Sequence, residues 1–148
     1  QRQMCIRDSM GTVVESQEDI DRMMAGTGPA VGLLLDTGHL TYAGGDPLKA
    51  IANHGARINH VHCKDIRPDV LQASKEDNSS FLKSVLAGVF TVPGDGCIDY
   101  TKVYAALQGF DYSGWLVVEA EQDPAVATPI KYAKMGYTQL AGIVGPDA

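Results

Sequence analysis

The sequence predicts an α/β fold with a parallel sheet, and three observations support it. Apolar runs that are typical of buried strands alternate along the chain with segments of helical spacing. Such alternation indicates parallel strands joined by helical crossovers, in either a doubly wound sheet or a TIM barrel. The predicted strands also end in polar residues, and both architectures place their sites at the carboxyl ends of strands.

Composition restricts the class of protein and its partners. Of the 148 residues 45% are hydrophobic, which is enough for a core, and the net charge of -6 argues against nucleic acid as a partner. No apolar run approaches the roughly 18 residues of a membrane span. The three cysteines are odd in number and lack CxxC spacing, which favours neither a disulfide framework nor a structural zinc site. We therefore expect a cytoplasmic protein.

The first residues differ in character from the rest. Residues 1–9 (QRQMCIRDS) show no apolar period, and the chain opens on Gln. We expect this segment to be non-native and to lie outside the fold. Residues 11–15 are expected to be the tail of a strand or a loop. Ser16 then has the position of an N-cap, followed by Ile20, Met23 and Met24 at helical spacing.

The middle of the chain contains two predicted strands. Residues 30–36 form a near-continuous apolar run, typical of a parallel strand buried on both faces, and the run ends at Asp36. Asp46 can cap a helix over residues 46–54, with Pro47 at its first turn and Gly55 after its end. A central strand is predicted over residues 57–62.

The last part is more polar at first and then alternates again. We expect helices over residues 70–75, 79–87, 99–107 and 129–141, and a loop over residues 92–96. A further buried strand is predicted over residues 114–119.

The central strand carries two histidines. Because strand side chains alternate between faces, His60, His62 and Lys64 are expected on one face, with Val61 and Cys63 on the other. His62 lies nearer the carboxyl end of the strand, so it is the better candidate ligand, while His60 suits packing. Lys64 could hold a substrate oxygen or act as an acid. The plainer alternative is one core histidine and one surface histidine.

Carboxylates close the neighbouring strands. Asp36, His62 and Glu119, with Glu15 as a fourth, would supply oxygen and imidazole donors for Mn²⁺, Co²⁺, Mg²⁺, Fe²⁺ or Zn²⁺. Glu121 shares a face with Glu119, but Glu119 directly closes the apolar strand and is preferred. Each carboxylate taken singly is commonly a cap or a solvated group, so the joint position is what indicates a site.

Five motifs together resemble the inosose dehydratases, a family of xylose-isomerase-like TIM barrels. The resemblance covers about residues 10–137 and implies that residues 10–148 are the C-terminal half of one truncated (β/α)8 barrel domain. The motifs are GTVVE at 11–15, LLDTGHL at 34–40, HVHCKD at 60–65, FTVPGDGCID at 90–99 and WLVVEAEQDP at 115–124.

The resemblance implies a lyase of inositol catabolism. Its reaction would remove water from 2-keto-myo-inositol, a small cyclic polyol ketone, to give a trihydroxycyclohexane-dione, with Mn²⁺ or Co²⁺ and a link to glutathione. By the same resemblance Glu15, Asp36, His62 and Glu119 are the metal ligands. The catalytic candidates are one of the metal-site glutamates, such as Glu15, as base and His39 or Lys64 as acid.

Two alternatives remain open from the sequence. A sugar isomerase or epimerase of the same superfamily would share the metal and the proton abstraction but not the loss of water. A non-catalytic half-barrel would associate with a partner or with itself as a homo-oligomer, and would show no metal affinity. Whichever function is correct, the chain alone is expected to be metastable, aggregation-prone or inactive, because a closed barrel needs eight strands.

Overall fold

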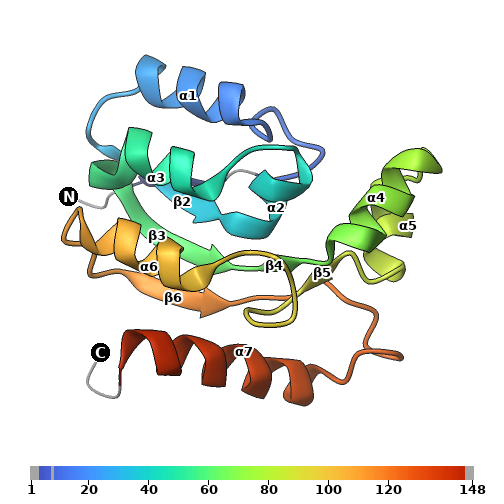
Figure 1. Ribbon diagram of the computed structural model, residues 1–148. Coiled ribbons are helices and arrows are strands. Elements are labelled where there is room, and N and C mark those ends of the chain that lie inside the picture. Colours follow the sequence, from blue (N-terminus) through green and yellow to red (C-terminus); the bar gives the residue numbers. More distant parts are fainter. Residues whose placement is uncertain (1–3, 8, 146–148) are drawn as a thin grey trace. The chain divides into compact units, whose positions relative to one another are not determined.

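The computed structural model describes residues 4–7 and 9–145 (Figure 1). These residues form two compact units. The first unit comprises Gln1–His62 and Thr101–Val117, and the second comprises Cys63–Tyr100 and Val118–Ala148. These bounds apply only to the residues that the structure describes. The elements alternate between strand and helix, so the predicted α/β class with parallel strand pairing is confirmed.

The first unit is built on a four-stranded sheet with the order β1-β2-β3-β6. The pairs β1/β2 and β2/β3 are both parallel. Leu33, Leu35 and Val61 are fully buried in its core, whereas Leu34, on the opposite face of β2, is half-buried. The strand bounds are Met4–Arg7 for β1, Val31–Asp36 for β2, Ile58–Cys63 for β3 and Trp115–Val118 for β6; Cys63 and Val118, the last residues of β3 and β6, fall in the second unit.

Helices of the first unit begin where their capping residues predict. Ser16 forms a capping box with Asp19, and the Asp46 side chain accepts the backbone N–H of Leu48. Figure 1 shows α1 and α3, which contact each other, lying along the strands. The bounds are Gln17–Gly26 for α1, Thr37–Tyr42 for α2, Pro47–His54 for α3, Gly55–Arg57 for the 3₁₀ turn η1 and Tyr100–Gln108 for α6, whose first residue falls in the second unit.

One arginine closes the connection from α1 to β2. The guanidinium of Arg57 donates to the backbone carbonyls of Met24 (2.7 Å), Gly28 (2.9 Å) and Val31 (2.7 Å) and to both oxygens of Thr27. The Met24 carbonyl lies in the last turn of α1, where helix carbonyls lack intrahelical partners, and the Gly28 carbonyl also accepts the backbone N–H of Val31 at 3.1 Å. Arg57 therefore ties the end of α1 to the start of β2.

The second unit contains a short antiparallel pair, β4 with β5, and three helices. Arg67 ties it together by donating to Asp95 (2.5 Å), to the Thr91 hydroxyl (3.1 Å) and to the Gly88 carbonyl (2.7 Å). The bounds are Asp65–Ile66 for β4, Pro68–Glu76 for α4, Phe81–Leu86 for α5, Phe90–Thr91 for β5 and Pro129–Val144 for α7.

Four features differ from the sequence predictions. Residues 4–7 form β1, although the segment was expected to lie outside the fold; its non-native origin stays a prediction. The helix α2 and the β4/β5 pair were not predicted, because six and two residues are too short for a periodic pattern. The prediction of a buried strand near residue 115 was wrong in its burial: β6 ends the sheet, and Trp115 is 76% exposed.

Within the described residues, no helix combines the length and the apolar character that crossing a membrane requires.

Candidate functional site

The register of β2 and β3 brings two predicted site residues side by side. Asp36 is the Cα partner of His62, and Leu34 is the partner of His60. Leu33, however, pairs with Ile58, so Asn59 is an extra residue in β3 and marks a bulge. If the pairing continued in regular register from Leu33 and Ile58, Asp36 would face Val61. The bulge therefore places the imidazole of His62 next to the carboxylate that ends β2.

The Asp36 carboxylate has two different environments. Its Oδ1 accepts the backbone N–H of His39 at 3.0 Å and so caps α2. Its Oδ2 lies 3.6 Å from Nδ1 of His62, which is longer than a hydrogen bond. Two donors about 2.1 Å from one ion are about 3.0 to 3.4 Å apart. The pair therefore has a spacing close to that of two ligands of one metal ion.

The two histidines of β3 share a face, as predicted. Their rings meet edge to face with centroids 5.4 Å apart, and both are half-buried while Val61 and Cys63 are buried. Burial, and then the charge of His62, lowers the pKa of His60. His60 is thus favoured in its neutral form beneath His62. The hydroxyl of Thr37 donates to the His62 carbonyl at 3.1 Å and helps to fix the strand end.

His39 is buried in the first turns of α2, with 2% of its surface exposed. Its Nδ1 accepts the backbone N–H of Met10 at 3.0 Å and lies 3.2 Å from the Ser9 hydroxyl. Because a backbone N–H can only donate, Nδ1 is the acceptor, and the neutral ring carries its proton on Nε2. The ring is therefore oriented so that Nε2 is the atom that could donate a proton.

Glu15 lies in the loop that precedes α1. Its Oε2 accepts the backbone N–H of Gly11 at 2.8 Å. In the described part of the chain, no hydrogen bond or ion pair joins Glu15 to Asp36 or His62. The structure therefore does not bring Glu15 to the pair at the ends of β2 and β3.

The remaining candidates belong to the second unit. Glu119 directly follows β6, and its backbone N–H donates to the Cys63 carbonyl at 3.4 Å. Lys64 is fully buried; its Nζ lies 2.7 Å from Oε2 of Glu121 and 3.6 Å from Oε1 of Glu119. The structure thus joins Lys64 to both glutamates of the Glu119-Ala120-Glu121 segment.

Sequence reasoning missed Asp65. Its Oδ1 accepts the backbone N–H groups of Ile66 (2.8 Å) and Ile98 (2.9 Å), and among the described residues its buried Oδ2 has no hydrogen-bond partner. Burial raises the pKa of this carboxyl, although the backbone donors oppose the effect. Asp65 thereby holds the loop after β5 against β4. The Gly-rich PGDG loop was the one sequence signal of such a close approach.

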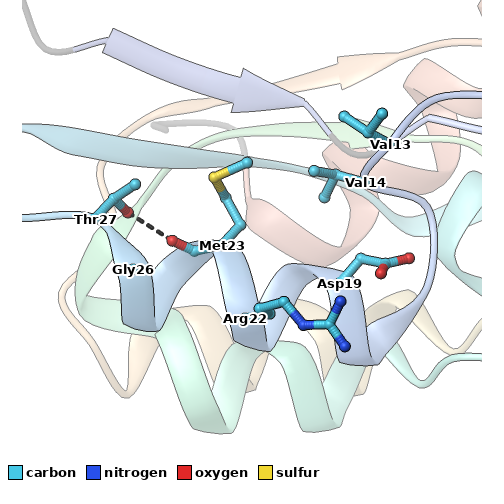
Figure 2. Close-up of a pocket in the computed structure, with 7 residues that line it drawn as sticks. All are labelled: Val13, Val14, Asp19, Arg22, Met23, Gly26 and Thr27. Atoms are coloured by element: carbon cyan, nitrogen blue, oxygen red, sulfur yellow. Dashed lines mark hydrogen bonds between the residues drawn. The ribbon is translucent and has the colours of Figure 1, made fainter.

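Two pockets have walls that include none of these residues. One, of about 200 Å³, lies between α1 and the preceding loop, where Val13, Met23 and Arg22 line it (Figure 2). Asp19 also lines it, but this carboxylate is engaged in the capping box of α1. The other, of about 130 Å³, lies in the second unit between Val92, Val118 and Tyr132. Both have largely apolar walls, and neither contains a predicted ligand.

Comparison with known proteins identifies similar chains. Residues 6–137 match the model of a family described as xylose isomerase-like TIM barrel. The chain is 54% identical over 132 residues to the rhizopine catabolism protein MocC of Rhizobium meliloti, covering 89% of this chain and 41% of that protein. It is 54% identical over 135 residues to an inosose dehydratase of Geobacillus kaustophilus, covering 90% of this chain and 44% of that protein.

A solved structure shares the fold. The crystal structure of IolI protein with a bound zinc atom matches with a TM-score of 0.65 at 17% identity, over 95% of this chain and 47% of that one. The chain therefore spans about two-fifths of the length of the curated relatives it matches and about half of this structure.

Proposed function

This chain belongs to the xylose isomerase-like TIM barrel family, and we propose that it carries the metal-binding part of a hydro-lyase. The substrate we propose is 2-keto-myo-inositol. Its support is the name inosose dehydratase, which the relatives at 53% and 54% sequence identity have. The observation that carries the proposal is the pair of Asp36 and His62, which lie side by side at the carboxyl ends of β2 and β3. In this fold, active sites form at those ends.

The donor set fits a divalent ion. Asp36 and His62 offer a carboxylate oxygen and an imidazole nitrogen 3.6 Å apart, a combination that suits Mn²⁺, Co²⁺ or Zn²⁺. We propose Glu119 as the third ligand. Its support is that β6 neighbours β3 in the sheet and that the Glu119 N–H bonds to the carbonyl of Cys63, the residue after His62.

The fourth proposed ligand comes from the loop before α1. We propose Glu15, as the resemblance implies, and this requires its carboxylate to leave the N–H of Gly11. Glu15→Gln separates the two roles given to this residue, because a ligand role predicts weaker metal binding, whereas a base role alone predicts normal binding with lost turnover.

The proposed chemistry divides the proton transfers between two side chains. A Mn²⁺ or Co²⁺ ion at this site would supply positive charge against the negative charge that develops on the ketone oxygen. Glu15 would remove the proton α to the ketone, and His39 would protonate the departing β-hydroxyl through Nε2–H. We prefer His39 to Lys64 as the acid because the Lys64 ammonium is already engaged by Glu121 at 2.7 Å.

The proposed partner is thus a small cyclic polyol ketone, and the proposed compartment is the cytoplasm. The support for the compartment is that Cys63 and Cys97 are both free thiols.

Two measurements test the proposal. Calorimetry on this chain tests Mn²⁺ binding. An ultraviolet assay for the dione product tests turnover in a completed chain, in which the N-terminal part of the Geobacillus kaustophilus relative is joined to residues 10–148. Binding with dione formation is expected, and omission of glutathione shows whether it takes part. Binding without dione would favour an isomerase or epimerase, and absence of binding would remove the metal site.

His62→Ala provides the sharpest single substitution. Because it removes a proposed ligand, it should weaken Mn²⁺ binding by about 100-fold or more while the far-ultraviolet circular dichroism is retained. His60→Ala, on the same face of β3 but farther from the strand end, is the matched control and should bind within a few-fold of the wild-type chain. Equal losses in both variants would contradict the ligand assignment.

A further inference from the structure

The side chain of Lys64 is fully buried and lies between two glutamates. Its exposed fraction is 0%, whereas the side chains of Glu119 and Glu121 are 27% and 36% exposed. A buried ammonium costs several kcal/mol unless it is paired with an anion. Both carboxylates therefore offset part of the cost of burying the Lys64 charge.

The two carboxylates share Lys64 unequally. Nζ of Lys64 lies within hydrogen-bond distance of Glu121, at 2.7 Å, but 3.6 Å from Oε1 of Glu119. The Lys64 ammonium is thus hydrogen-bonded to Glu121 and forms a longer ion pair with Glu119.

Contacts to the main chain hold both Lys64 and Glu119 in place, and an aromatic ring packs near the Lys64 ammonium. The Tyr100 hydroxyl donates to the Lys64 carbonyl at 2.9 Å, and the Phe90 ring lies 5.2 Å from Nζ. The Glu119 N–H donates to the Cys63 carbonyl. With the main chain held at these two points, rotation of side chains is enough for the ammonium to change partner.

We propose that Glu121 is a positioning residue that holds the Lys64 ammonium away from Glu119. This inference rests on the proposed metal site, in which Glu119 is a ligand. If Glu121 loses its charge, the Glu119 carboxylate remains 3.6 Å from the buried ammonium. Lys64 then pairs with Glu119 and competes with the divalent cation for the same carboxylate.

A double-mutant cycle on this chain tests the inference, with Mn²⁺ affinity measured by calorimetry as the readout. Glu121→Gln should weaken binding about tenfold or more. Lys64→Met, which removes the competing charge, should bind at least as tightly as the wild-type chain. The double variant, Glu121→Gln with Lys64→Met, should recover the affinity that Glu121→Gln alone loses. A merely structural role of Glu121 predicts no such rescue.

Glu18→Gln is the matched control, because Glu18 is an exposed glutamate paired with Arg22 on α1. It should leave the affinity unchanged, and circular dichroism checks the fold of every variant. Mn²⁺ binding that is unaffected by Glu121→Gln, or not rescued in the double variant, or lost in Lys64→Met, would overturn the inference while leaving the metal site in place. Absence of binding by the wild-type chain would overturn the metal site itself.

Discussion

Two carboxylates of the second unit respond in opposite directions to their surroundings. Burial raises the pKa of Asp65, which accepts backbone N–H groups only. For Asp95 burial acts in the same direction, but the Thr91 hydroxyl and the Arg67 guanidinium outweigh it and lower the pKa. Since each shift links folding to proton binding, the two residues should give opposite pH dependences of stability.

For Asp65 the folded state holds its proton more tightly than the unfolded state. Stability is therefore lost as pH rises from 3.8, the ordinary pKa of an aspartate, through the raised pKa of Asp65. Asp65→Asn, which keeps an acceptor for Ile66 and Ile98, should gain stability relative to the wild-type chain over that rise. The free energy of unfolding in urea, measured from pH 3 to 7 in the completed chain, gives the difference. A pH-independent difference would contradict the effect of burial.

Asp95→Asn should behave in the opposite way. The lowered pKa of Asp95 stabilises the fold above 3.8, and this contribution is lost as pH falls through the folded-state pKa. The variant should therefore be less stable than wild type by on the order of 1 kcal/mol at pH 7, since a charge-assisted hydrogen bond is lost. The same urea series should show the deficit shrink toward pH 3. A deficit that grows on acidification would rule out this assignment.

At the same scale, the sequence could identify the ends of the strands but not how they are aligned. Asp36, His62 and Glu119 stand out because each polar side chain follows an apolar run. The extra residue Asn59, which aligns His62 with Asp36, could not be foreseen. Its location depends on the pairing of two strands, which local periodicity does not contain.

At the scale of elements, the Arg57 hydrogen bonds make a turn dependent on one side chain. Arg57→Met leaves the carbonyls of Met24, Gly28 and Val31 without this donor. The free energy of unfolding should fall by about 2 to 3 kcal/mol. Arg22→Met, which removes only the exposed pair with Glu18 on α1, should change it by less than about 0.5 kcal/mol. Similar losses in urea unfolding for the two variants would show that the turn does not depend on Arg57.

A second element, the loop between β5 and α6, depends on a glycine without room for a side chain. A Cβ on Gly96 would press against the Asp65 carboxylate and the Ile66 carbonyl. Gly96→Ala should cost about 1 to 3 kcal/mol of stability. Gly142→Ala in α7 is the matched control, because nothing lies within 4 Å of its Cβ position, and it should stabilise by about 0.5 to 1 kcal/mol. Thermal unfolding that changes in the same direction in both would contradict the steric cause.

The elements that were predicted are those with strong local signals. Ser16 and Asp46 act as the caps that their sequence contexts indicate, and Pro129 begins α7 as expected. The helix α2 was missed because Asp36 serves both as the last residue of β2 and as the N-cap of α2. A short helix that begins inside a strand end has no separate pattern to detect.

At the scale of the whole molecule, the length of the chain decides how the sheet ends. The sheet has four strands, and a closed barrel of this family has eight. The alternation of strands and helices along the sequence predicted the α/β fold class correctly. The burial of β6 was overestimated, because an apolar strand near the chain end has the same sequence pattern whether or not a second neighbour covers it.

Trp115, the one tryptophan of the sequence, reports on that edge. It is 76% exposed at the start of β6, so its fluorescence should be strongly quenched by acrylamide in this chain. In the completed chain the added strands can pair with β6, and quenching of Trp115 should fall several-fold while the thermal unfolding temperature rises. Subtraction of a Trp115→Phe variant isolates the signal. Equal quenching in the two chains would mean that the edge stays open.

The shared carboxylate of Asp36 has a further consequence for experiments on this protein. One oxygen bonds to the amide of His39, while the other faces His62. The amide proton of His39 can exchange with solvent only when the first turn of α2 opens. Any ligand that holds Asp36 in place must also slow that opening. Hydrogen exchange at this single backbone position would therefore report occupancy of the site directly, without substrate and without turnover.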